Sequence, residues 1–361
     1  MINEINVKQT GILMSIVMLA DKFVILPSLT FYKAGFAGIF VTIFLLSLDL
    51  LIFYLIIKFK ERHQDSKVDQ VLVNSVGKFF TKLVYIILFA YFLMRILLLL
   101  NENFTFLKDL VYEDASFFLF ILCLLPVVNA MTFTGLRSMG RSAQFFYWFV
   151  VAGLIISMMA GVFSSSFNLP TIKFNKQMLS APLKLCFWFS DYLFFFLIVD
   201  KIKLEKNYGT TIMRYLIFTA VLLVVLNLIF VGLHDVDTFI YKGALADIIQ
   251  FSSISPGIGK IDIVAVLTKM FVIYFQFGVM FYCLKEALNN IVGNLNIYHS
   301  IILLDFIILS IEYFCLVTME KIVELSLTTF NLITLAFLAI LLAIFLFTRL
   351  KQKRRGYEKI Y

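Results

Sequence analysis

Charged side chains inside long apolar stretches are the residues of this sequence best able to do chemistry. A charge at the middle of a bilayer costs at least ~2.5–3.5 kcal/mol on insertion scales, so each one needs a partner, a water-filled cavity or a function. Such groups can hold a charged solute or a coupling ion. The candidates are Asp21, Lys22, Asp49, Arg95, Asp191, Lys269, Asp305 and Glu312.

No arrangement typical of an enzyme accompanies these charges. His63, His234 and His299 have no partners at zinc-ligand spacing. The segment 257–261 resembles a phosphate-binding loop, but its Lys is followed by Ile rather than by Ser or Thr. The four cysteines lie in apolar stretches and form no Cys-x-x-Cys pair. We therefore expect no catalytic residue, no metal and no cofactor.

The elements that must position the charges are apolar helices. The sequence is 61% hydrophobic, contains 42 Phe and is only 15% charged. A hydrocarbon core of about 30 Å requires ~20 apolar residues per helix, and in it each backbone polar group must be satisfied within its own segment. The sequence predicts an all-α integral membrane protein with ten spans: Thr10–Leu29, Phe36–Ile57, Phe79–Leu100, Ser116–Phe133, Ala143–Phe163, Pro182–Val199, Thr211–Leu233, Ile263–Leu284, His299–Met319 and Leu325–Phe347.

The basic residues predict how these spans are oriented. Lys and Arg gather in every second link and in the C-terminal tail, whereas acidic residues occupy the alternate links. By the positive-inside rule both termini are cytoplasmic. The net charge of +8 then reflects topology, not nucleic-acid binding. The basic tail is better interpreted as a stop-transfer flank than as a contact with anionic membrane lipid.

One integral domain over residues 1–361 is expected, because no link is long enough to separate two domains. The ten spans divide into helices 1–5 (about 10–163) and helices 6–10 (about 182–347), followed by a basic tail at 348–361. Five is odd, so the second group runs in the opposite sense to the first. This favours a 5+5 inverted-repeat transporter fold, in which the first helix of each repeat is broken near the midplane to hold a ligand.

A ligand site is therefore predicted where helices 1 and 6 turn polar. Its residues are Ala20, Asp21, Lys22, Phe187, Trp188, Ser190, Asp191 and Tyr192. A zwitterionic amino acid suits this set, because its carboxylate can meet Lys22 or a half-helix N-terminus and its ammonium can meet Asp21 or Asp191. The aromatic residues would then select the side chain by shape.

The other intramembrane charges have plainer interpretations. Arg95 has Glu102 seven residues further along as a structural partner, and Asp305 and Glu312 share one helix face. For Lys269, a snorkelling side chain and a functional one are equally good interpretations. Small residues at four-residue spacing in helix 5 favour close packing within the chain over dimerisation: Gly153, Ser157, Gly161 and Ser165.

One outer link carries a further pattern. Ala244–Phe251 can form a short amphipathic helix along the outer interface. It is either a passive cap before helix 8 or a lid or partner contact.

The order of segments resembles the permease-like B subunits of spore-germination nutrient receptors, relatives of the amino acid/polyamine/organocation transporters. The resemblance rests on the start at 5–9 followed by Pro27, the link Gly135-Leu-Arg-Ser-Met-Gly-Arg141, the stretch 244–262 before helix 8, and the basic tail. The chain departs from the family pattern at Lys269, where members often have Trp, and at Tyr147-Trp148, where a Pro is common.

The resemblance implies a transporter-like subunit that senses a small nutrient, works with A-type and C-type partner subunits and resides in the spore inner membrane. The alternative is an ion-coupled secondary amino-acid transporter that uses the intramembrane acids. A scaffold that has lost its pocket is a third interpretation. The first two share one fold, so the sequence does not separate them.

Overall fold

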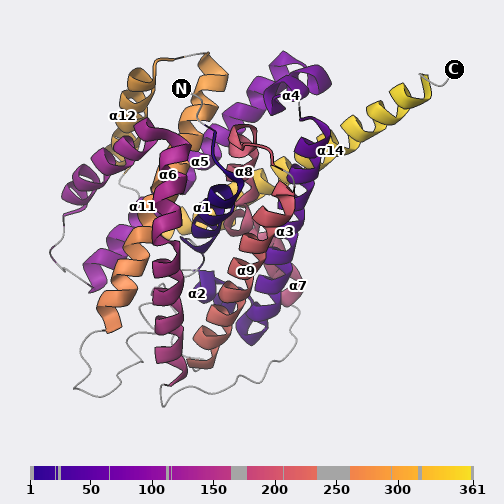
Figure 1. The fold of residues 1–361 in the computed structure, drawn as a ribbon. Coiled ribbons are helices and arrows are strands. Elements are labelled where there is room, and N and C mark those ends of the chain that lie inside the picture. The colour runs from indigo at the N-terminus through magenta and orange to yellow at the C-terminus, as the bar shows by residue number, and fades with distance from the viewer. Residues whose placement is uncertain are drawn as a thin grey trace.

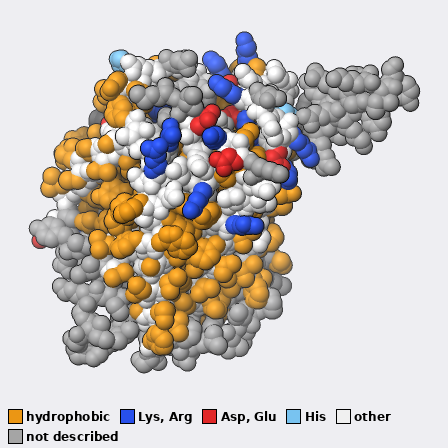
Figure 2. Space-filling model, in the orientation of Figure 1, with side chains coloured by type: hydrophobic (Ala, Val, Ile, Leu, Met, Phe, Trp, Pro, Cys, Tyr) orange, Lys and Arg blue, Asp and Glu red, His pale blue; other side chains and the backbone are white. Residues whose placement is uncertain are grey.

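Apolar helices make up nearly all of the chain that the structure, a computed structural model, describes: residues 4–20, 22, 26–64, 66–110, 114, 116–163, 177–205, 207–233, 261–293, 295–315 and 319–358. Across these residues the only strand-like pairing is a single bridge between Ile5 and Ile202. Within the described ranges, seven helical stretches are long and apolar enough to cross a membrane. Apolar side chains cover the flank of the molecule in Figure 2, and charged ones gather at one end. The protein is an all-α integral membrane protein, as predicted.

The helices follow one another along the chain as α1 Val7–Ala20, α2 Leu26–Ala34, η1 Gly35–Ala37, α3 Gly38–Arg62, α4 Val68–Val76, α5 Lys78–Leu110, α6 Phe117–Val162, α7 Gln177–Leu185, η2 Cys186–Phe189, α8 Tyr192–Ile198, η3 Val199–Lys201, α9 Tyr208–Leu233, α11 Ile261–Val292, α12 Ile297–Cys315, α13 Met319–Leu327 and α14 Thr329–Glu358 (Figure 1). The ten-span count and the inverted repeat stay predictions. By length and composition, for example, Leu26–Arg62 counts as one candidate span, although it includes residues of the first and the second predicted spans and of the link between them.

Two predicted spans, the fourth and the fifth, fall within α6. At about 1.5 Å per residue a straight helix of 46 residues would be roughly twice as long as the hydrocarbon core is thick. The helix is interrupted at Gly135, whose φ is 80° and ψ 174°. Residues with a Cβ essentially never adopt this conformation. Gly135 therefore divides α6 into two helices, as its position in the predicted link requires.

The first and sixth predicted spans are both discontinuous. Helix α1 ends at Ala20 and α2 begins at Leu26. The sixth span passes from α7 into the 3₁₀ turn η2 and leaves helical geometry at Ser190, where φ is −126° and ψ 36°, before α8 begins. The interruption in the sixth span therefore leaves backbone polar groups inside the protein, where they can meet side chains.

Helix α11 is the central element that supports these segments. It packs against α5, α6, α1 and α8, while α1 also packs against α9 (Figure 1). The approach of α6 to α11 is close at Gly153, because a Cβ added there would overlap the Thr268 side chain. The small residue thus serves packing within the chain, as predicted.

The links predicted to be cytoplasmic meet at one end of the bundle. Ile5 N–H donates to Lys201 O at 2.9 Å, and Lys203 N–H donates to Ile5 O at 3.0 Å. Nearby, Lys60 Nζ lies 2.8 Å from Asp200 Oδ1, and Val68 N–H donates to Asp200 Oδ2 at 2.7 Å. Figure 1 places α4 and the last described turns of α14 in the same upper part of the view. The predicted helix at Ala244–Phe251 lies outside the described residues.

Candidate functional site

A buried ion-pair cluster joins the two discontinuous segments. Lys22 Nζ contacts Asp191 Oδ2, and Arg95 NH2 lies 3.3 Å from Asp191 Oδ1. All three side chains are fully buried. Lys22 follows α1, Asp191 immediately precedes α8, and Arg95 comes from the middle of α5. One carboxylate therefore contacts two cations that come from distant parts of the chain.

Aromatic rings surround the two cations. The Arg95 guanidinium lies 5.2 Å from the Phe187 ring centroid, 5.8 Å from that of Phe194 and 6.0 Å from that of Tyr91. Lys22 Nζ lies 5.6 Å from the Phe189 ring centroid. Ring faces attract cations, and the attraction is stronger where water is excluded. The cations are thus held by rings as well as by Asp191.

The backbone at the second interruption is held by a short hydrogen-bonded chain. Ser190 Oγ donates to Phe187 O at 2.5 Å, and Tyr91 OH lies 2.6 Å from Ser190 Oγ. A serine hydroxyl has one proton, so the Tyr91 hydroxyl donates to Ser190. Arg95 NH1 also donates to Phe187 O at 3.4 Å. These contacts tie α5 to the irregular backbone.

Asn331 of α14 satisfies further backbone groups of the same segment. Its Nδ2 donates to Leu183 O, and its Oδ1 accepts from Phe187 N–H at 3.1 Å. A buried backbone group without a partner would destabilise the fold, by ~1–3 kcal/mol each. The 3₁₀ turn therefore persists without Gly or Pro, because a side chain replaces the missing helical bonds.

Asp49 is the second carboxylate of the cluster. Its side chain is fully buried on α3, and Oδ1 accepts from Tyr192 N–H at 3.3 Å. Oδ2 has no hydrogen-bond partner among the described residues. The carboxyl group lies within electrostatic reach of Asp191 and Lys22. Asp49 thus joins the site with far fewer contacts than Asp191 has.

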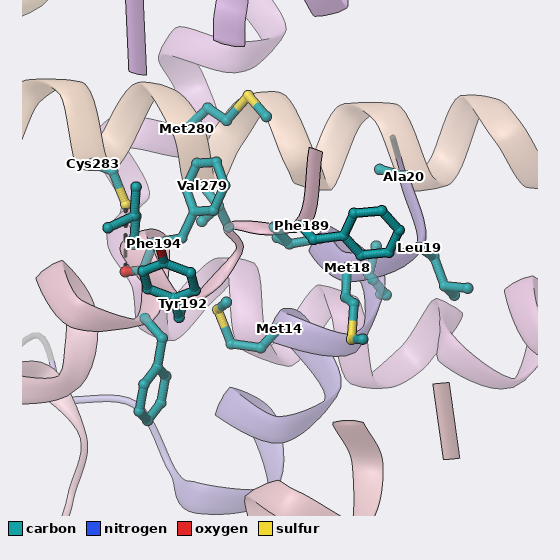
Figure 3. Packing of buried hydrophobic residues seen from close by; sticks show 14 of the residues in the cluster. Met14, Met18, Leu19, Ala20, Phe189, Tyr192, Phe194, Val279, Met280 and Cys283 are labelled. Carbon is teal, nitrogen blue, oxygen red and sulfur yellow. Dashed lines mark hydrogen bonds between the residues drawn. The ribbon is translucent and has the colours of Figure 1, made fainter. Parts of the chain in front are cut away.

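Apolar side chains form the wall around this polar centre. Figure 3 shows Met14 and Met18 of α1 together with Phe189, Tyr192 and Phe194, beside α11 residues such as Met280. Phe187 and Trp188 are fully buried in the same cluster. The Trp188 Nε1 donor has no hydrogen-bond partner in the described part of the chain. Trp188 therefore has an N–H donor that a ligand can use, in addition to its apolar ring.

Most of the predicted ligand set lies together in the structure. Lys22, Ser190 and Asp191 interact as described, and Ala20 and the predicted aromatic residues are buried beside them. Asp21 lies outside the described residues. Asp49 and Arg95, predicted only as intramembrane charges, belong to the same cluster. For Arg95 the structure adds a partner that was not predicted, because its guanidinium pairs with Asp191 on another segment. The pairing with Glu102 stays a prediction.

Four residues that contribute to the centre were not predicted as site residues: Tyr91, Phe189, Phe194 and Asn331. Asn331 and Tyr91 are polar groups within apolar spans, a signal that sequence reasoning can use. The two Phe residues carried no such signal, because Phe is abundant throughout.

The remaining intramembrane charges lie elsewhere. Lys269 Nζ is 3.3 Å from the Phe106 ring centroid. Asp305 Oδ2 accepts from Asn129 Nδ2 at 2.7 Å, and Glu312 Oε1 accepts from Asn101 Nδ2 at 3.1 Å. Both acids of α12 thus turn toward neighbouring helices, as their shared face predicts.

Among the described residues, no group of three or more His, Cys, Asp or Glu side chains is placed to hold a metal ion. The centre instead combines two carboxyl groups with two cations, an arrangement that suits a ligand carrying both signs of charge.

Comparison with solved structures identifies the fold. The chain is similar to a crystal structure of a single-site mutant of the manganese transporter of Eremococcus coleocola, with a TM-score of 0.60 and 9% identity over 94% of this chain and 78% of that one. It is also similar to the same transporter in complex with an aromatic bis-isothiourea substituted compound, with a TM-score of 0.58, 10% identity and the same coverage. No family model matches the chain, and no curated protein matches it significantly in sequence. The fold is thus that of a membrane transporter.

Proposed function

We propose that this protein binds a small amino acid at the polar centre between α1 and α8 and works as a nutrient sensor built on a transporter fold. The observation that carries the proposal is the buried cluster of Lys22, Asp191 and Arg95 at the interruption of two helical segments. Charges are costly in a membrane, so their concentration at one place calls for a function.

Binding would proceed by exchange of partners. The ligand carboxylate takes Lys22 and Arg95, and its ammonium takes Asp191. These side chains are already out of water, so the exchange adds no desolvation cost for the protein charges. Opening the Lys22–Asp191 pair separates α1 from α8. Ligand binding is thereby linked to movement of the two segments, which is what both a sensor and a transporter require.

Manganese, the substrate named for the structurally similar transporter, is not our proposal. A divalent cation entering this centre would meet Lys22 and Arg95, and both repel it. Their carboxylate partner, Asp191, has both of its oxygens in contact with them. An organic carboxylate meets these two cations favourably.

The physiological setting follows from the resemblance to B subunits of germination receptors. In this setting the protein lies in the spore inner membrane, and its ligand-driven movement is transmitted to A-type and C-type subunits. Co-purification of these partners with the tagged protein tests this setting. The alternative, an ion-coupled secondary transporter, predicts uptake of labelled amino acid by proteoliposomes that contain this chain alone.

Binding itself can be tested on the purified full-length protein. Thermal shifts are measured with each standard L-amino acid, with the corresponding amino-acid amides and with Mn²⁺. We expect at least one amino acid to stabilise the protein, and its amide to bind with an affinity about tenfold or more lower than that of the amino acid. Mn²⁺ should not stabilise the protein. Stabilisation by Mn²⁺ alone would contradict the proposal.

A matched pair of variants locates the binding site. Lys22→Gln should weaken amino-acid binding by about tenfold or more, because the ligand carboxylate loses a cation. Lys60→Gln removes another Lys–Asp pair, which is partly buried and lies at the end predicted to be cytoplasmic, and should leave the affinity unchanged. Equal effects of both variants would place the ligand elsewhere.

A further inference from the structure

The charges of the cluster are unevenly matched. Asp191 uses both oxygens on the two cations, whereas the described contacts of Asp49 are one backbone N–H at 3.3 Å and electrostatic interactions with Asp191 and Lys22. No cation is in contact with Asp49 among the described residues. An ionised, fully buried carboxylate with one long hydrogen bond, beside a second carboxylate, is unfavourable.

The groups that face Asp49 come from several elements. Lys22 follows α1, Asp191 and Tyr192 lie at the start of α8, and Arg95 of α5 is one contact further away. Lys22 is already engaged by Asp191. A proton on Asp49 Oδ2 would remove the repulsion between the two carboxyl groups and turn the unpartnered oxygen into a donor.

We propose that Asp49 is a proton-binding site that sets the affinity of the centre for an anionic group. With Asp49 neutral, Lys22, Arg95 and Asp191 together carry one net positive charge, which favours a ligand carboxylate. When Asp49 gives up its proton, these four groups sum to zero and the attraction falls. The step is a reversible protonation from the aqueous phase, with no bond changed other than O–H.

This inference deepens the proposed function and rests on it for the ligand. Its consequence is that amino-acid binding and proton binding favour each other. By linkage, the ligand binds more tightly at lower pH and takes up a proton where Asp49 is ionised. A transporter of this kind would move the solute with a proton, and a sensor would respond more strongly at low pH.

The first test needs no ligand. Asp49→Asn and Asp191→Asn replace two fully buried aspartates of the same cluster, and their melting temperatures are compared with that of the unaltered protein. Asn is neutral like a protonated Asp49, so Asp49→Asn should melt within a few degrees of the unaltered protein. Asp191→Asn leaves two cations without their carboxylate and should melt far lower or not fold. Equal destabilisation, or failure of Asp49→Asn to fold, would overturn the proposal.

A second ligand-free measurement observes the proton directly. The infrared spectrum of the unaltered protein minus that of Asp49→Asn should contain the carbonyl stretch of a protonated carboxylic acid. Asp305 and Glu312 contribute equally to both spectra and cancel. A carboxylate difference in place of the acid band, at every pH from about 5 to about 8, would show that Asp49 stays ionised and would overturn the proposal.

The coupling is tested with an equimolar mixture of the standard L-amino acids as the probe. The mixture should stabilise the unaltered protein more at about pH 5 than at about pH 8. It should stabilise Asp49→Asn equally at the two pH values. A pH dependence that persists in Asp49→Asn would contradict the inference. Loss of all stabilisation in the unaltered protein would contradict the proposed function instead and leave the infrared result to decide the proton site.

Discussion

At the scale of single residues, the centre depends on side chains that replace regular backbone bonding. Asn331 is the clearest case, because one amide serves a carbonyl and an N–H on either side of the α7–η2 junction. Ser190 Oγ bonds the Phe187 carbonyl oxygen, and the Tyr91 hydroxyl bonds Ser190 in turn. The irregular backbone is thus part of a connected polar network, in which removal of one member leaves others without partners.

Asn331→Ala should therefore destabilise the protein. The change leaves Leu183 O and Phe187 N–H without this partner, at ~1–3 kcal/mol for each group. Thr334→Ala is the control, since Thr334 is also buried on α14 but bonds only to Phe330 O within its own helix. Melting temperatures followed by tryptophan fluorescence should fall clearly for the first variant and little for the second. Similar small shifts would mean that water can replace Asn331.

At the scale of elements, a chain of apolar helices is divided by a few local features. Gly135 divides α6, and a cluster of side chains maintains the interruption before α8. These interruptions matter because a straight helix satisfies its own backbone and offers nothing to a ligand. The discontinuous segments are therefore where a polar ligand can bind in an otherwise apolar bundle.

Gly135→Ala tests the interruption in α6. An L-residue at φ 80° and ψ 174° is strained by on the order of 1–3 kcal/mol. We expect a lower melting temperature and poorer yield of folded protein. Ser142→Ala, at an exposed helical position of α6, should have neither effect. A normal melting temperature for Gly135→Ala would indicate that the backbone there can adopt ordinary helical geometry.

At the scale of the whole molecule, charge distribution and packing agree. The basic links that the positive-inside rule assigns to one side include the segments joined by the Ile5–Ile202 bridge and by the Lys60–Asp200 pair. The flank between the two ends is apolar (Figure 2). The bundle therefore has one strongly charged end and a band that suits lipid.

The topology makes a direct prediction. A reporter fused after Tyr361, or inserted within residues 61–78, should be found in the cytoplasm, because both positions adjoin clusters of Lys and Arg. A reporter inserted within residues 109–114, which are acidic, should be found outside. Paired activity measurements of a cytoplasm-active and an export-active reporter check all three sites. Reversed signals at all three sites would overturn the predicted orientation, and signals that do not alternate would overturn the span count from which the inverted repeat is predicted.

The amino-acid sequence was sufficient for the class of protein, the approximate helices and the list of charges that needed an explanation. These properties depend on sums over many residues, such as the length of an apolar stretch and the number of Lys and Arg in a link. The assignment of any one residue therefore changes the conclusion little. The positions of Lys22, Asp49, Arg95 and Asp191 within apolar spans were evident for the same reason. The inverted repeat remains a prediction from span count.

Only the tertiary structure decided which charges meet. Lys22 and Asp191 are 169 residues apart in the chain, and Arg95 contacts Asp191 from a third helix although Glu102 lies nearer in sequence. Partner choice depends on how α5, α8 and the end of α1 pack, which no local pattern encodes. The isolation of Asp49 follows from the same packing, because the cations it would otherwise attract are already bound to Asp191.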